Sequence, residues 1–375
     1  MQCDYFDAGR CRSCSLMTVD YSAQLRAKDT QAHQALAEVI HAGAWAAPFA
    51  SAESGFRNKA KLVVGGTPGA VTLGILDPVG RGVDLRDCGL HEPALRDAIP
   101  DLAAFVNDLR LLPYDVPKGR GELKHLLVTV NTDEELQVRI VLRSERQAAR
   151  IREALPHLRR VMPQLRVLSI NLQPAHKAVL EGDTEIVLTA GNVLPMRLPE
   201  VTLMLRPGSF FQTNTTVAAG LYGQARQWFA QGPASSTVWD LHCGVGGFAL
   251  HLSDPDREIT GVEISPAAIA SAREGKPAQQ GPLRFLVDDA TAFAQRSPSV
   301  PDVIVVNPPR RGIGHELATW IEGSGVPRML YSSCHPQSLA ADLAVMPSLH
   351  AVRARLFDMF PQTRHAEVLV LLERR

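Results

Sequence analysis

The stretch VWDLHCGVGGFAL, residues 238–250, constrains the fold of this chain more than any other part of the sequence. An apolar run is followed by a turn containing Gly244, Gly246 and Gly247, after which apolar residues resume. This order predicts a strand, a tight turn and a helix, because glycine accepts backbone angles that other residues avoid. Such a turn lets a ligand approach the backbone N–H groups at the positive end of a helix.

Strands and helices are expected to alternate through the rest of the C-terminal half, after a helix at about 215–230. The segments of strand length and character are 237–243, 258–264, 283–289, 301–309, 328–334 and 365–373. This alternation predicts an α/β fold with a doubly wound, Rossmann-like parallel sheet. In such a sheet, ligands bind at the carboxyl ends of the strands.

The part of the chain before about residue 200 has a different pattern, which is typical of an α+β domain with antiparallel strands. It predicts helices over 20–44 and 144–162, hairpins over 57–76 and 176–191, and strands over 123–130, 137–143 and 166–172. We therefore expect three parts: a cysteine-bearing start at 1–95, a central α+β domain at 96–204 and an α/β domain at 205–375.

Two features of the glycine turn bear on its ligand. Glu263 follows Gly244 by nineteen residues, at the end of the next strand, where a carboxylate can bind ribose hydroxyls. Gly244, Gly246 and Ala249 also satisfy a loose G-x-G-x-x-A pattern, so a nicotinamide-dependent oxidoreductase remains open. Asp240 lies just before the glycines and disfavours a pyrophosphate, whereas it suits the cationic ligand S-adenosylmethionine.

The segment VVNPPRRGIG, residues 305–314, places the amide of Asn307 at the end of another strand. Two prolines with fixed φ stiffen the chain there, so a rigid amide can meet the polar edge of a planar base. Methyltransferases that act on exocyclic amines of bases use a similar Asn-Pro-Pro-aromatic tetrad. Arg310 stands where the aromatic residue would be, which disfavours N-methylation.

Cys334 ends the strand that follows Asn307, so its thiol is expected in the same cleft. Methylation of uracil at C5 needs such a nucleophile, because C5 alone is too electron-poor to attack a sulfonium methyl group. A thiolate that adds to C6 generates an enolate, whose C5 can attack. A general base must then remove the C5 proton, and Glu367, at the start of the next strand, is our candidate.

The cysteines are unevenly placed. Cys3, Cys11 and Cys14 form a C-x7-C-x2-C array, and Cys88 is available as a fourth ligand. Three close thiolates with a distant fourth favour a [4Fe–4S] cluster, in which each iron takes one thiolate. A zinc site, which usually has two pairs of ligands, remains open on spacing alone, and so do unrelated cysteines.

The composition of the chain limits the classes of protein to which it can belong. The formal net charge is zero and the isoelectric point is about 7.2, which excludes a strongly basic nucleic-acid-binding chain. Arginines at positions between 143 and 160 form a local basic stretch, either a nucleic-acid surface or a solvated helix face. The start has no signal-peptide pattern and no apolar run reaches 18 residues, so we expect a cytoplasmic protein without membrane segments. No feature requires an obligate protein partner.

Taken together, these motifs resemble those of the RNA uracil-C5 methyltransferases. The resemblance is carried, in order, by SFFQTN, DLHCGVGGF, NPPRRGIG, YSSC and HAEVLVLL. GFRNKAK, RGELKH and LFDMFPQT extend it over essentially the whole chain. The short N-terminal start, with no small β-barrel RNA-binding domain before it, is similar to that of family members acting on 23S ribosomal RNA.

The resemblance implies a site and its ligands. Cys334 would be the nucleophile and Glu367 the proton acceptor. The residues around S-adenosylmethionine and the base would be Gln212, His242, Glu263 and Asn307, with Asp289 as a further contact to adenine. The cluster ligands would be Cys3, Cys11, Cys14 and Cys88, holding [4Fe–4S]. His242 departs from the family, which commonly has Phe or Tyr at that position.

The resemblance also implies a partner, 23S ribosomal RNA, free or in a pre-ribosomal particle, with the central α+β domain binding RNA. The expected product is 5-methyluridine. A different uridine in ribosomal or transfer RNA remains open as the target. So does a non-catalytic iron–sulfur protein that binds RNA or assists assembly.

Overall fold

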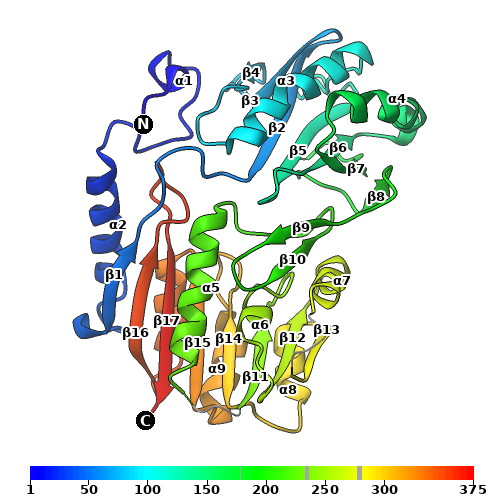
Figure 1. The fold of residues 1–375 in the computed structure, drawn as a ribbon. Coiled ribbons are helices and arrows are strands. Elements are labelled where there is room, and N and C mark those ends of the chain that lie inside the picture. Colours follow the sequence, from blue (N-terminus) through cyan, green and yellow to red (C-terminus); the bar gives the residue numbers. More distant parts are fainter. Residues whose placement is uncertain (178, 233–235, 277–280) are drawn as a thin grey trace. The chain divides into compact units, whose positions relative to one another are not determined.

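The computed structural model describes residues 1–177, 179–232, 236–276 and 281–375 (Figure 1). The chain forms two compact units that are interleaved in sequence. Unit 1 contains Met1–Met17 and Glu53–Arg197, and unit 2 contains Thr18–Ala52 and Leu198–Arg375. Residues 18–52 thus belong to the unit that carries the glycine turn, and not to the N-terminal part at 1–95 expected from sequence.

Unit 1 is an α+β unit, as expected. Its described residues form a seven-stranded sheet in the order β4-β3-β2-β5-β6-β7-β8, in which only β6 and β7 pair in parallel. The strands are β2 (Lys59–Thr67), β3 (Ala70–Leu76), β4 (Gly82–Asp84), β5 (Leu123–Val130), β6 (Leu136–Leu142), β7 (Leu165–Leu172), β8 (Thr184–Val187) and the separate β9 (Leu194–Arg197). The helices are α1 (Asp4–Asp7), α3 (Pro93–Asp108), η2 (Glu145–Gln147) and α4 (Ala148–Val161).

Apolar residues explain how unit 1 packs. α3 and α4 bury leucines and isoleucines such as Ile99 and Ile151 in one core with alternate residues of the sheet, for example Leu62 and Leu126. The hairpin predicted over 57–76 is confirmed as β2 and β3. The hairpin predicted over 176–191 is wrong: β8 is the strand described there and it pairs with β7, while residue 178 lies outside the described residues.

Unit 2 contains an eight-stranded sheet within the described residues, in the order β1-β16-β17-β15-β14-β11-β12-β13. The strands of unit 2 are β1 (Trp45–Phe49), β10 (Thr202–Leu205), β11 (Ser236–Leu241), β12 (Arg257–Glu263), β13 (Leu283–Val287), β14 (Val303–Val306), β15 (Arg328–Ser333), β16 (Leu349–Phe357) and β17 (Glu367–Arg374), and all except β10 belong to this sheet. Its helices are α2 (Tyr21–Ala35), η1 (Ala42–Ala44), α5 (Thr215–Phe229), α6 (Gly247–Leu252), α7 (Pro266–Glu274), α8 (Ala290–Arg296), α9 (Gly314–Ser324) and α10 (Pro336–Ala344).

The order of the central strands creates a switch point. From β11 the chain proceeds to β12 and β13 on one side, and then returns to β14 and β15 on the other. All five strands are parallel, so the predicted doubly wound α/β fold is confirmed. Leu241 pairs with Val306, and the next residues, His242 and Asn307, therefore emerge together at the carboxyl edge.

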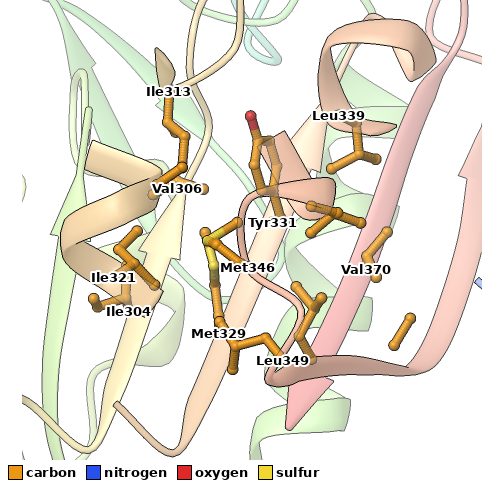
Figure 2. Close-up of a cluster of buried hydrophobic side chains, with 14 of the residues drawn as sticks. Ile304, Val306, Ile313, Ile321, Met329, Tyr331, Leu339, Met346, Leu349 and Val370 are labelled. Atoms are coloured by element: carbon orange, nitrogen blue, oxygen red, sulfur yellow. The ribbon is translucent and has the colours of Figure 1, made fainter. Parts of the chain in front are cut away.

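β17 makes this sheet mixed rather than wholly parallel. It lies between β15 and β16 and runs antiparallel to both. Beneath these strands, α9 and α10 close a core that includes Ile304, Val306 and Tyr331, all fully buried (Figure 2). The central strands β14 and β15 are buried on both faces, which explains the apolar runs VIVV and MLY in the sequence.

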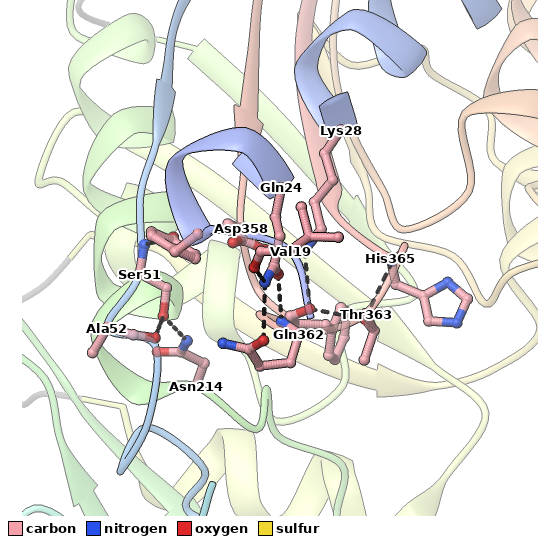
Figure 3. Close-up of polar contacts among 12 residues, drawn as sticks. Val19, Gln24, Lys28, Ser51, Ala52, Asn214, Asp358, Gln362, Thr363 and His365 are labelled. Carbon is pink, nitrogen blue, oxygen red and sulfur yellow. Dashed lines mark hydrogen bonds and ion pairs between the residues drawn. The ribbon is translucent and has the colours of Figure 1, made fainter. Parts of the chain in front are cut away.

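Residues 18–52 belong to unit 2 because β1 extends its sheet in parallel with β16. The helix predicted over 20–44 ends at Ala35, since the chain must turn and extend to enter β1. Lys28 Nζ donates hydrogen bonds to Asp358 Oδ1 (2.6 Å) and to the carbonyl of Phe360 (3.0 Å) (Figure 3). Lys28 and Asp358 are buried, so this pair holds the loop after β16 against α2.

No helix in the described part of the chain is long and apolar enough to span a membrane.

Candidate active site

A cavity of about 590 Å³ lies in unit 2 at the carboxyl ends of β11, β12, β14 and β15. It is lined by all six residues that the sequence analysis placed in the site: Gln212, His242, Glu263, Asn307, Cys334 and Glu367. The fold therefore brings together six side chains that are spread over 156 positions of the sequence, from 212 to 367. Asp289 also lines this cavity.

The glycine turn forms one wall. Gly244 and Gly246 have positive φ (56° and 85°), which only glycine adopts without strain. Asp240 Oδ2 accepts a hydrogen bond from the N–H of Ala249 (2.9 Å), which ties the start of α6 to the end of β11. Burial raises the pKa of Asp240 to about 7. Asp240 is fully buried and is not among the described lining residues, so it supports the turn rather than facing a ligand.

Glu263 is the acid that does line the cavity. Its Oε2 accepts a hydrogen bond from the N–H of Gly244 (3.3 Å), and its Oε1 accepts one from Ser265 (2.9 Å). These two bonds fix the carboxylate beside the turn. An ionised carboxylate has about four acceptor positions, so it can still accept hydrogen bonds from the two hydroxyls of a ribose.

His242 occupies a strained position beside Glu263. Its φ is +70°, in the left-handed region that residues other than glycine rarely adopt. The imidazole Nδ1 lies 3.0 Å from the carbonyl oxygen of Leu241, to which it can donate a hydrogen bond. Burial lowers the pKa of His242, so the ring is neutral at pH 7 and can replace an aromatic side chain without adding charge.

Hydrogen bonds to the side chain of Asp342 fix the loop that starts at Asn307. Asp342 Oδ2 accepts hydrogen bonds from the N–H of Ile313 (2.9 Å) and from the hydroxyl of Tyr331 (2.6 Å). A side chain at Gly312 would collide with the same carboxylate. Sequence reasoning missed the roles of Tyr331 and Asp342. Tyr331 opens the YSSC motif and Asp342 belongs to no motif, and only the packed structure joins both to the loop.

Cys334 and Glu367 reach the cavity from neighbouring strands. Ser333 pairs with Val368 in the antiparallel ladder of β15 and β17. The residue after Ser333, Cys334, therefore lies opposite the residue before Val368, Glu367. The start of an antiparallel strand lies at the same sheet edge as the ends of the parallel strands. This direction explains why a residue at the beginning of β17 faces one at the end of β15.

Both groups have raised pKa values. Glu367 is 1% exposed, and burial raises its pKa to about 7 despite a hydrogen bond from Ser332 Oγ (2.5 Å) that favours the charged form. Burial, followed by the nearby Glu367, raises the pKa of Cys334 to about 11, while Arg310 lowers it. A carboxyl group that titrates near neutral pH is suited to accept and release a proton.

The mouth of the cavity carries apolar surface that the sequence analysis did not single out. Phe210 is 66% exposed and Ile264 is 70% exposed, and both line the cavity. Gln212, two residues after Phe210, is buried. Asn214 follows, caps α5 through the N–H of Val217 (3.2 Å) and so fixes this segment at the cavity. An exposed aromatic ring here can stack on a planar base.

The four cysteines proposed as cluster ligands all belong to unit 1. Burial, followed by the nearby Cys88, Cys11 and Cys3, raises the pKa of Cys14 to about 12, so the four thiols lie near one another. Cys14 packs with Phe56 and Leu90 in a small apolar cluster. As the side chains stand, however, no group of three or more His, Cys, Asp or Glu residues in the described regions could hold a metal ion.

Similar proteins agree with this geometry. The chain is 45% identical over 375 residues to the 23S rRNA (uracil(747)-C(5))-methyltransferases of Shigella boydii serotype 4 and of Escherichia coli O17:K52:H18. Each alignment covers 99% of both chains. This chain belongs to the 23S rRNA (uracil(747)-C(5))-methyltransferase family. The resemblance inferred from the motifs is therefore confirmed.

Two family models and one solved structure agree with this assignment. Residues 299–375 match the tRNA (Uracil-5-)-methyltransferase model, and residues 203–321 match the methyltransferase small domain. The tRNA (uracil-54, C5)-methyltransferase of Pyrococcus abyssi, solved with S-adenosyl-L-homocysteine, aligns with a TM-score of 0.79 and 22% identity. That alignment covers 96% of this chain and 85% of the other. It supports the fold of an S-adenosylmethionine-dependent methyltransferase. The family assignment favours methyl transfer over the nicotinamide-dependent oxidoreductase that the glycine pattern left open.

Proposed function

We propose that this protein transfers the methyl group of S-adenosylmethionine to C5 of a uridine in 23S ribosomal RNA, forming 5-methyluridine. The observation that carries the proposal is the pairing of Cys334 with Glu367 in a cavity that also contains the glycine turn. A thiol and a carboxyl group at the same end of a methyl-donor cleft suit uracil C5 chemistry. N-methylation of a base needs no such nucleophile.

The proposed reaction uses the pair in sequence. The Cys334 sulfur bonds to uracil C6, and the electrons of the C5–C6 double bond move toward O4 as an enolate. C5 then attacks the methyl carbon, the carbon–sulfur bond of the sulfonium breaks, and S-adenosylhomocysteine is left. Glu367 accepts the C5 proton, the C5–C6 double bond re-forms, and the Cys334 sulfur leaves as thiolate.

Protonation states limit when each step can begin. With a pKa of about 11, Cys334 is a thiol in the empty cavity at pH 7, and it must lose its proton to solvent as uracil binds. Arg310 is the neighbouring cation that favours the thiolate. With its pKa near 7, Glu367 is about half ionised at neutral pH and can accept the C5 proton.

The remaining cavity residues are proposed to position the two substrates. Glu263, fixed by two backbone N–H groups, would accept hydrogen bonds from the ribose of the methyl donor. His242 and Gln212 would contact the donor, and Asn307 would meet the polar edge of uracil through its amide. These roles rest on the shared cavity and on the family pattern.

The N-terminal cysteines are proposed to hold a [4Fe–4S] cluster. Cys3, Cys11, Cys14 and Cys88 come from two segments of unit 1 whose thiols interact electrostatically. A cubane cluster takes one thiolate per iron, so its ligands need not converge on a single ion. The cluster would link the first residues of the chain to the loop at Cys88. Methyl transfer from a sulfonium needs no electron, so the proposed role is structural.

RNA is the proposed partner, bound in part by unit 1, and this places the protein in the cytoplasm, where ribosomal RNA is modified. The choice of 23S RNA over transfer RNA rests on the relatives that are 45% identical.

The decisive experiment combines mapping with trapping. Purified protein should methylate 23S RNA from a strain that lacks the gene, and sequencing should locate a single 5-methyluridine. With 5-fluorouridine-containing RNA and S-adenosylmethionine, a covalent complex should accumulate, because fluorine cannot leave as a proton. Cys334→Ala should abolish the complex. An adduct that forms equally well in this variant would overturn the assignment, and methylation of transfer RNA alone would replace the substrate.

A further inference from the structure

Unit 1 contains a second cavity, of about 370 Å³, that no step of the methyl transfer uses. It lies on the face of the sheet opposite α3 and α4. Val63 and His125 are directly paired across β2 and β5, and both line the cavity. Their neighbours Leu62 and Leu126 lie in the core with α3 and α4, and alternate residues of a strand face opposite sides.

A bulge in β5 gives this cavity a buried cation. The pairing of β5 with β6 shifts between Leu123 and His125, so Lys124 and His125 both line the cavity although they are adjacent. Lys124 is only 5% exposed. Its Nζ donates to the side-chain oxygen of Gln173 and to the carbonyl of Ala175 (2.8 Å). The ammonium group also lies 4.6 Å from the ring centroid of Tyr114.

None of these partners of Lys124 carries a negative charge, and no carboxylate among the described residues forms an ion pair with it. Burial, and then the nearby Arg143, lowers the pKa of Lys124, so its surroundings add positive charge rather than neutralise it. Lys177 also lines the cavity, and the described lining contains no acid. A buried cation without a counter-ion is costly, and an anion that enters removes that cost.

The rest of the cavity suits a planar, partly apolar group. Its apolar lining consists of Val63, Leu76, Val116, Val179 and Leu180. The hydroxyl of Tyr114 lies 2.6 Å from Nδ1 of His176. Nδ1 of His125 is buried without a hydrogen-bond partner among the described atoms. Burial lowers the pKa of His125 to about 4, so the ring is neutral and can hydrogen-bond a polar edge.

An anion site beside an aromatic ring and an apolar wall matches the two halves of a nucleotide, a phosphate and a base. We propose that this cavity binds one unstacked nucleotide of the substrate RNA, distinct from the target uridine, with its phosphate at Lys124 and Lys177 and its base against Tyr114. The inference rests on the proposed function, because it takes RNA as the substrate. The positive lining disfavours S-adenosylmethionine, whose sulfonium is itself a cation.

The test measures binding of a 23S RNA fragment to the full-length protein as a function of salt. Lys177→Glu changes an exposed side chain, and Lys124→Met keeps the length of a buried one. Each should weaken RNA binding about tenfold. Each should also reduce the slope of log affinity against log salt concentration by roughly 0.7 to 0.9, the change expected for one lost phosphate contact. Arg110→Glu is the matched control, because Arg110 is an exposed cation just after α3, which packs on the opposite face of the sheet, and lies outside the basic stretch at 143–160.

A direct probe separates this inference from the proposed function. Calorimetry should detect 5′-UMP binding at millimolar concentration to the wild type, with inorganic phosphate binding more weakly and neither binding to Lys124→Met. All variants should bind S-adenosylmethionine as the wild type does. RNA affinities of Lys177→Glu and Lys124→Met that equal that of Arg110→Glu would overturn the inference. A wild type that binds 5′-UMP here but methylates no RNA would instead overturn the proposed function and leave this site standing.

Discussion

Ser332 donates a 2.5 Å hydrogen bond from its hydroxyl to Oε1 of Glu367, between two adjacent strands of the unit 2 sheet. Both residues are almost fully buried, with exposed fractions of 0% and 1%. The hydroxyl favours the charged carboxylate and so opposes the effect of burial on the pKa of Glu367. The buried Ser332 hydroxyl thus lowers the pKa of the carboxyl group that is proposed to remove the C5 proton.

Replacing Ser332 with alanine should raise the pKa of Glu367 further above about 7. Glu367 must be ionised to accept a proton, so proton removal should require a higher pH in Ser332→Ala. A hydrogen bond to a charged group is worth about 1.5 kcal/mol or more, which corresponds to a shift of about one pH unit. The pH dependence of single-turnover product release measures this shift.

Ser333→Ala is the matched control for that measurement. The Ser333 hydroxyl donates to the backbone oxygen of His335 (3.2 Å) and not to Glu367. Its pH profile should therefore stay close to that of the wild type. If Ser333→Ala shifts the profile as much as Ser332→Ala does, the hydrogen bond to Glu367 is not the cause.

Glu367→Gln should separate methyl transfer from release. The amide cannot accept the C5 proton, but Cys334 can still add to uracil and C5 can still take the methyl group. Enzyme linked to methylated RNA should accumulate, visible as a slowly migrating band in a denaturing gel with labelled methyl donor. Complete loss of the adduct would mean that Glu367 acts earlier, in binding or in activating Cys334.

The same substitution should make the protein more stable at alkaline pH. The folded-state pKa of Glu367, about 7, lies above its ordinary value of 4.5, so the folded protein holds this proton more tightly than the unfolded chain does. Below about pH 4.5 the two states are equally protonated, and the penalty grows until about pH 7. At 1.4 kcal/mol per pKa unit, Glu367→Gln should gain up to about 3 kcal/mol near pH 8.

Thermal unfolding of both proteins near pH 5 and near pH 8 tests whether the stabilisation by Glu367→Gln increases with pH. The difference in unfolding free energy between Glu367→Gln and the wild type should be larger at the higher pH. A gain that is the same at both pH values would point to packing rather than to the buried charge.

The cluster proposal predicts a spectroscopic change that does not depend on activity. Anaerobically purified wild type should be brown and contain about four iron atoms per chain. Cys11→Ser should lose the colour and melt at a lower temperature, yet bind S-adenosylmethionine normally. Ser13→Ala, which removes the hydroxyl 3.5 Å from the Cys11 sulfur but no thiol, should keep the iron. A wild type that binds zinc and no iron would contradict the proposal.

Much of the site could be predicted from sequence because its chemistry occurs in short segments. The turn at Gly244 and Gly246, the amide of Asn307 and the thiol of Cys334 each follow an apolar run that predicts a strand. The side chains that support them escaped prediction. Asp342 contacts Ile313 and Tyr331 across 29 and 11 positions, and no local pattern indicates such contacts.

The sequence by itself determined the strands β11 to β15 and β17, the position of the glycine turn and the reactive side chains at the ends of these strands, because these properties depend on neighbours along the chain. It did not indicate β1 or β16. Only the tertiary structure decided that β17 runs antiparallel beside β15, which brings Glu367 to Cys334. It also decided that residues 18–52 join unit 2 and that Lys124 is a buried cation in unit 1. Strand direction, burial and pKa depend on partners far away in sequence, so they exist only once the chain has folded.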